Sequence, residues 1–145
     1  MEIDALFHGP GWTARPTFVD DVAAVVAQDA WVLDSIGYES VRDLVWDRAD
    51  TLVWLDLPRW QVMPRVVRRT ARRALLRTEL WNGNRERLGG WRDREHPIRL
   101  AWSEHKARRA LVAERLADPR WAHLTVHHLR SARQARAWRA EQLGR

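Results

Sequence analysis

Short apolar runs alternate with helical patterns along this chain, and no other feature of the sequence restricts the fold as strongly. Residues 31–34 (WVLD) and 51–57 (TLVWLDL) are typical of buried strands, because their apolar residues are continuous rather than alternating with polar ones. Residues 123–129 (HLTVHHL) predict a further strand. Strands that alternate with helices favour a parallel sheet with helices on both faces. The sequence therefore predicts an α/β fold.

The helical segments carry regular apolar spacing and start signals. Residues 18–28 place four apolar side chains at helical spacing, and Asp20 and Asp21 fall in the first turn, where the helix dipole favours acids. Further helices are predicted over residues 41–46, from residue 59 onward, over residues 98–116, and from Ser131 to about residue 143. The expected order is strand, helix, strand, helix, strand, long helix, lid, helix, strand, helix.

The length and composition favour one domain. The chain has 145 residues, is 46% hydrophobic and contains no Cys, which excludes a disulfide scaffold and a thiolate metal site. Residues 79–97 combine three of the seven glycines with many charges, so we expect a lid or mobile loop there. No apolar run is long enough to span a membrane and the first ten residues do not resemble a signal peptide, so we expect a cytoplasmic protein without a membrane partner.

The charge of the chain is strongly basic. The formal net charge is +6 and the pI is near 11.2, which makes an anionic partner plausible. Lys106 is the only Lys among 25 basic residues, and GC-rich coding DNA produces such an excess of Arg without selection for a ligand. The positions of the arginines must therefore decide what they do. Nine of them lie between Arg59 and Arg87.

Three of these arginines recur every four residues. Arg65, Arg69 and Arg73 share one face of the predicted long helix, where like charges repel one another by a few tenths of a kcal/mol per pair. An arginine presents a planar fork that matches pairs of phosphate oxygens. The face is either a phosphate clamp or a solvated surface that acids elsewhere in the fold balance.

Two carboxylates stand at or near the carboxyl ends of predicted strands. In open α/β sheets ligands bind at this edge, and Asp34 or Asp56 could hold Mg²⁺ there directly or through water. Such residues also end strands for ordinary turn reasons. Asp34 is the better placed of the two, because the irregular residues 35–38 follow it.

Several stretches together resemble a known family. They are IDALFHGPGW from Ile3, WVLD from Trp31, RADTLVWLDLPR from Arg48, RVVRRTARR from Arg65 and ELWNGNRE from Glu79. These stretches resemble the adenylate-kinase-like P-loop proteins known as topology modulation proteins, and the resemblance covers nearly the whole chain. It implies a three-layer parallel sheet of the P-loop nucleotide kinase type with an Arg-rich lid. It also implies ATP and Mg²⁺ as cofactors and transfer of the ATP γ-phosphoryl group to a small acceptor.

The resemblance assigns residues to the ATP side of such a site. Asp34 matches the Walker B carboxylate and would support Mg²⁺. Arg65 and Arg69 match the helix arginines that face the adenine and the phosphates of ATP. Arg73 and Arg85 fall in or beside the lid, where arginines close over the phosphate in transfer. The resemblance thus implies that these four arginines are catalytic.

The resemblance also assigns residues to the acceptor. Asp4 lies where related small kinases place a residue facing the phosphate acceptor, and we expect Tyr38, Arg59 and Glu86 to contribute to substrate binding. The family usually has Gly-Asn-Tyr after the Walker B carboxylate. Here residues 35–38 read SIGY, which is one residue longer.

One family motif is absent from this sequence. A P-loop requires G-x-x-x-x-G-K-[ST], but the single Lys, Lys106, has no glycine near it. We expect that about 30 residues are missing before Met1, comprising the first and central strand, the P-loop and the first helix. The resemblance thus implies an N-terminally incomplete P-loop kinase-like domain, and without the P-loop we expect it to turn over ATP weakly or not at all.

A second class of function is open at this point. The arginine face and the ten tryptophans could bind nucleic acid, with the rings stacking on bases. The simpler account of the tryptophans is packing in the core or lid, since Trp31 and Trp54 lie inside apolar runs. A remnant without activity is the third alternative.

Overall fold

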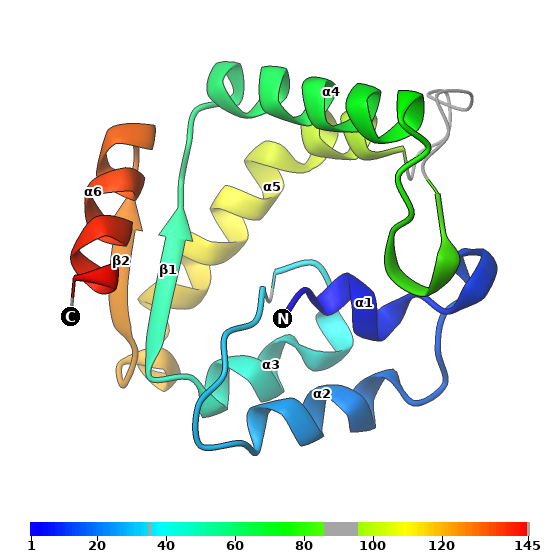
Figure 1. The fold of residues 1–145 in the computed structure, drawn as a ribbon. Coiled ribbons are helices and arrows are strands. Elements are labelled where there is room, and N and C mark those ends of the chain that lie inside the picture. Colours follow the sequence, from blue (N-terminus) through cyan, green and yellow to red (C-terminus); the bar gives the residue numbers. More distant parts are fainter. Residues whose placement is uncertain (35, 86–95, 145) are drawn as a thin grey trace. The chain divides into compact units, whose positions relative to one another are not determined.

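The computed structural model describes residues 1–34, 36–85 and 96–144 (Figure 1). The chain divides into two compact units by its internal contacts. The first unit consists of Met1–Ala49 and Arg72–Leu88, and the second consists of Asp50–Ala71 and Gly89–Arg145.

Helices α1 (Ile3–Phe7), α2 (Phe18–Val26) and α3 (Glu39–Arg48) build the core of the first unit. The predictions of helices near residues 18–28 and 41–46 are confirmed, and α3 extends beyond its predicted ends. Apolar side chains at helical spacing on α2 and α3 pack with the start of α1. The buried members of this core are Ile3, Phe18, Val22, Val26, Val41 and Val45.

Two predicted strands of this unit are wrong. The first element of the chain is helix α1, and residues 31–34 form no strand. Val32 is 82% exposed, whereas Trp31 and Leu33 beside it are half-buried, so the apolar run is covered on one side only. A side-chain hydrogen bond fixes the segment instead, because Ile3 N–H donates to Asp34 Oδ1 at 2.7 Å.

The second unit contains a parallel two-stranded sheet. Strands β1 (Thr51–Leu55) and β2 (Thr125–Leu129) pair along their whole length, with Trp54 opposite His128. The predicted strands near residues 51–57 and 123–129 are therefore confirmed. In each strand a run of β-branched and aromatic residues favours the extended backbone.

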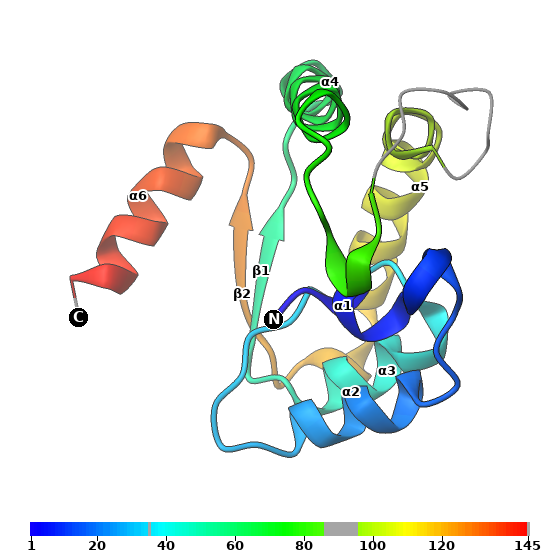
Figure 2. The ribbon, with the colours of Figure 1, turned by 45° about the vertical axis from the view of Figure 1, so that its right-hand side comes forward.

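Helices cover both faces of this sheet (Figure 2). Successive residues of a strand point to opposite faces, so His127 and His128 lie on different sides. His127 contacts Trp138 of helix α6 (Ala132–Leu143), with ring centroids 5.5 Å apart. On the His128 side, Asp56 binds Arg109 of helix α5 (Pro97–Ala117). The α/β class is therefore confirmed, with α5 and α6 on opposite faces of β1 and β2.

The bounds of three further helices agree with the sequence signals. Helix α4 (Arg59–Leu75) follows β1, as the pattern after Pro58 predicted. Helix α5 begins at Pro97 and ends at Ala117, close to the predicted residues 98–116. Ser131 caps α6, because its side chain accepts a hydrogen bond from Gln134 N–H at 3.2 Å.

Only part of the predicted lid falls within the described residues. Residues 79–85 form a tight turn in which Glu79 and Arg85 make an isolated antiparallel bridge around the short helix η2 (Trp81–Gly83). Gly83 has φ of 80°, in the left-handed region that favours glycine. Residues 86–95, including Glu86, lie outside the described part of the chain.

Candidate functional site

One face of α4 carries a row of exposed arginines. We call Arg65, Arg68, Arg69 and Arg72 the arginine face, since residues three and four apart lie next to one another on a helix. All four side chains are exposed, whereas Thr70 of the same helix is 1% exposed and points to the opposite side. The amphipathic pattern of α4 thus turns a charged surface to solvent.

The arginine face has no acidic counterpart within the described part of the chain. Among residues 1–34, 36–85 and 96–144, none of its four members forms an ion pair. Arginines elsewhere do find carboxylates, as Arg15 binds Asp21 at 2.9 Å and Arg108 binds Glu104 at 3.1 Å. The like charges along the face therefore repel one another by ~0.2 to 0.5 kcal/mol for each neighbouring pair, and none of these described contacts offsets the repulsion.

The other predicted arginines have different surroundings. Arg73 follows the face in sequence but is only half exposed. The guanidinium of Arg59 lies 4.5 Å from the ring centroid of Trp102, a cation–π contact. Arg85 forms an ion pair with Glu79 at 3.6 Å. The exposed face thus includes Arg65 and Arg69 of the predicted set.

Asp4 and Tyr38, both predicted to bind substrate, meet in the first unit. Tyr38 O–H donates to Asp4 Oδ1 at 2.7 Å, and His8 Nε2 lies 3.4 Å from the same hydroxyl. The Tyr38 ring also packs against two phenylalanine rings, with its centroid 4.3 Å from that of Phe7 and 5.1 Å from that of Phe18. A half-buried carboxylate, hydroxyl and imidazole therefore lie together, next to the aromatic rings of Phe7 and Phe18.

Sequence reasoning missed the asparagines that fix this region. Asn84 is 4% exposed, and its side-chain amide donates to Gly9 O and to Trp81 O, both at 2.9 Å. Its Oδ1 accepts from Trp12 N–H at 2.9 Å. Asn82 donates to the carbonyl of His8. The WNGN sequence thus holds the turn at residues 81–84 to the loop that follows α1. In the sequence, these two asparagines stood out only as part of the ELWNGNRE stretch that carries the family resemblance.

Asp34, predicted to support Mg²⁺, is exposed, and its Oδ1 accepts the hydrogen bond from Ile3 N–H. The described residues contain no cluster of three or more His, Asp or Glu side chains that could hold a metal ion.

Asp56 is the centre of a polar cluster in the second unit. Its side chain is 4% exposed, it forms an ion pair with Arg109, and His128 Nε2 lies 2.9 Å from Oδ2. Burial raises the pKa of Asp56, but the hydrogen bonds with Arg109 and His128 outweigh burial, so the pKa lies below its ordinary value. The carboxylate is therefore ionised and holds α5 against the sheet.

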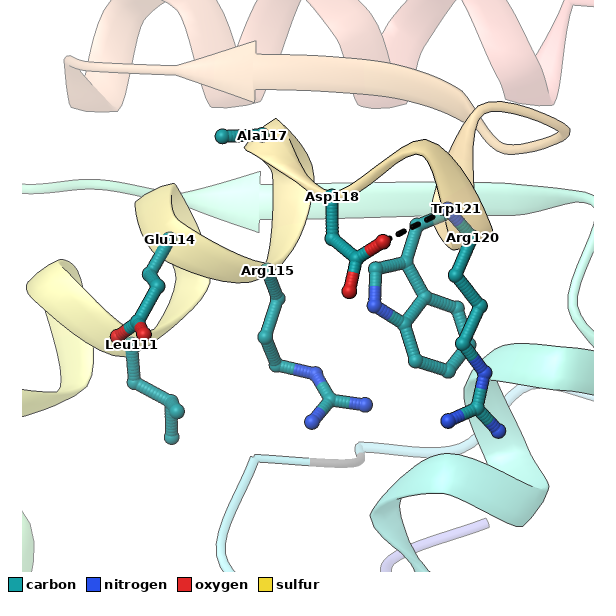
Figure 3. Close-up of a pocket in the computed structure, with 7 residues that line it drawn as sticks. All are labelled: Leu111, Glu114, Arg115, Ala117, Asp118, Arg120 and Trp121. Atoms are coloured by element: carbon teal, nitrogen blue, oxygen red, sulfur yellow. Dashed lines mark hydrogen bonds between the residues drawn. The ribbon is translucent and has the colours of Figure 1, made fainter.

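A surface pocket of about 450 Å³ lies where α5 ends (Figure 3). The guanidinium groups of Arg115 and Arg120 lie 4.6 Å and 4.4 Å from the ring centroid of Trp121. Glu114 and Asp118 line the same pocket and balance these two charges. The pocket thus has no excess charge to select an anion.

Comparisons of the chain with protein-family models, with curated proteins and with solved structures found no match. Within the residues that the structure describes, no helix is long and apolar enough to cross a membrane.

Proposed function

We propose that this chain binds the phosphate groups of a nucleotide on the arginine face of α4. The single observation that carries the proposal is the exposure of Arg65, Arg68, Arg69 and Arg72 without an acidic partner in the described part of the chain. An anion stabilises a row of arginines that has no acidic neighbours among the described residues, because it relieves the repulsion between the guanidinium groups. The proposed ligand class is a nucleoside triphosphate.

The geometry of the helix suits a chain of phosphates. Arg65 and Arg72 are seven residues apart, which is ~10 Å along a helix axis with a rise of ~1.5 Å per residue. Each guanidinium can bind two oxygens of one phosphate group with two parallel hydrogen bonds. Arg65 and Arg69 are also the two positions that the resemblance to adenylate-kinase-like proteins assigns to ATP, which supports the same ligand.

The proposal is binding rather than catalysis by the 145-residue chain. Phosphoryl transfer requires groups that position the γ-phosphate and neutralise its charge. The 145-residue sequence contains neither the glycine-rich loop nor the lysine next to it that serve this purpose in P-loop kinases. We therefore expect ATP to bind without measurable turnover.

Isothermal titration with ATP tests the proposal in variants with matched charge. The double variant Arg65→Gln/Arg69→Gln removes two charges from the arginine face, and Arg133→Gln/Arg136→Gln removes two exposed charges from α6. The first should weaken ATP binding about a hundredfold or more, because it removes two charged hydrogen bonds that contribute ~1.5 to 3 kcal/mol each. The second should leave the affinity nearly unchanged. Equal losses in both variants would mean that ATP responds to net charge alone.

A second candidate ligand is single-stranded nucleic acid, since two large rings are exposed near the start of α4. Trp60 is 73% exposed and Trp102, which contacts Arg59, is 57% exposed. Aromatic rings next to a basic surface can stack on bases while arginines bind phosphates. An oligonucleotide should then bind more tightly than ATP, with an affinity that falls steeply with salt and in proportion to the phosphates contacted. A shallow salt dependence favours the nucleotide.

A further inference from the structure

The carboxyl ends of β1 and β2 gather basic groups that neither the arginine face nor the resemblance involves. Arg130 follows β2 directly, and its Nε and Nη2 each lie 3.5 Å from a ring nitrogen of His128. Arg109 reaches the same place from α5 through its ion pair with Asp56. The Asp56 carboxylate thus contacts Arg109 and His128, and Arg130 contacts the His128 ring at the end of β2.

Two contacts hold the imidazole of His128 in one orientation. Asp56 Oδ2 lies 2.9 Å from Nε2, so Nε2 carries the proton that forms this hydrogen bond. The ring of Trp54, opposite His128 in the sheet, stacks on the imidazole with centroids 3.9 Å apart and an angle of 8° between the planes. The remaining nitrogen, Nδ1, therefore points away from Asp56 and lies beside Arg130.

Among the described residues, the two arginines next to Asp56 and His128 carry more positive charge than the single carboxylate of Asp56 offsets. Arg109 uses the carboxylate of Asp56, whereas Arg130 has no acidic partner among the residues that the structure describes. The side chain of Arg109 is about half exposed, and its guanidinium has five N–H groups, more than its contacts with Asp56 occupy. Arg130 also directly precedes Ser131 and α6, whose positive dipole end adds to the potential.

We propose that Arg109 and Arg130 bind a phosphate group beside His128 at the carboxyl ends of β1 and β2, as a site separate from the arginine face. Asp56 and Trp54 position Arg109 and the His128 imidazole, and Nδ1 of His128 can accept a hydrogen bond from Arg130 and so position its guanidinium. A phosphate group accepts hydrogen bonds on several oxygens from donors that converge from different elements, and arginine forks match pairs of these oxygens. This edge of a parallel sheet is also where ligands bind in open α/β folds.

NMR titration of the full chain with inorganic phosphate tests the site, with the imidazole of His128 and the indole of Trp54 as reporters. We expect saturable shifts of both reporters. Arg130→Gln should weaken the apparent affinity about tenfold, as expected for one charge-assisted hydrogen bond. Arg133→Gln, which removes an exposed charge three residues further along the chain, should leave the affinity unchanged. A parallel titration with glycerol 3-phosphate shows whether a phosphomonoester or free phosphate is preferred.

Two outcomes would overturn the site. One is the absence of a saturable shift at His128, and the other is an equal loss of affinity in the Arg130 and Arg133 variants. Arg130→Lys separates a general charge effect from the guanidinium fork, and it should recover only part of the affinity. The Arg65→Gln/Arg69→Gln variant should retain the phosphate response of His128, so failure of this site and failure of the arginine face are distinguishable.

Discussion

Replacing Asp56 by Asn should cost about 2 kcal/mol of the free energy of unfolding. The carboxylate is 4% exposed and forms hydrogen bonds with both Arg109 and His128. Removing one member of a fully buried ion pair costs ~3 to 5 kcal/mol. Here the cost is smaller, because the side chain of Arg109 is 52% exposed and can be solvated when its partner is lost.

Urea denaturation followed by circular dichroism measures this cost. With a denaturant slope of ~2 kcal/mol per M, a loss of about 2 kcal/mol lowers the midpoint by about 1 M. Asp29→Asn is the matched control, because Asp29 is exposed. A change in the Asp56→Asn midpoint no larger than that of the control would refute the stabilising role of this cluster.

The same cluster predicts the direction of a pH effect. Because the pKa of Asp56 is lowered in the folded chain, its contribution is fully present above the unfolded pKa of ~3.9 and is lost as the pH falls through the folded value. The difference in the free energy of unfolding between the wild type and Asp56→Asn should therefore stay constant from about pH 7 to 5. It should become smaller as the pH falls below about 4. A difference that does not change down to pH 3 would contradict the assigned cause.

Two further substitutions test contacts of the first unit. Tyr38→Phe removes the hydroxyl that donates to Asp4, and we expect a loss of about 1 kcal/mol that disappears when Asp4→Ala, which removes the acceptor, is already present; additive losses in this double-mutant cycle would exclude the coupling. Gly83→Ala should cost about 1 kcal/mol, because Gly83 has φ of 80° although a Cβ there meets nothing within 4 Å. Gly37→Ala is the control, since a Cβ at Gly37 also meets open space and its φ is not positive; equal effects would refute the argument from backbone strain.

The helices could be predicted because their signals are local. Four apolar residues at helical spacing and two acids in the first turn define α2 within nine residues. Strands β1 and β2 are runs of β-branched and aromatic residues, and they find each other as parallel neighbours. The run at residues 31–34 has the same composition, but a strand also needs a partner, and composition carries no information about pairing.

The candidate sites also differ in whether a local sequence pattern can reveal them. Spacing alone put Arg65 and Arg69 on one helix face, since helix geometry is fixed by the backbone. The cluster around Asp56 joins residues 53 and 72 positions apart in the chain, so no local pattern could assign its partners. Asn84 likewise binds Gly9 from 75 positions away. Such contacts depend on how distant segments fold together.

The most direct test of the proposed nucleotide binding is NMR detection of the arginine side-chain Nε–Hε groups during titration with ATP. If ATP binds the arginine face, the resonances of Arg65, Arg68, Arg69 and Arg72 shift together with one saturation curve, while those of Arg133 and Arg136 on α6 stay in place. Uniform small shifts of all arginines, or no shifts on α4 at saturating ATP, would contradict the claim that this helix face is the nucleotide-binding surface.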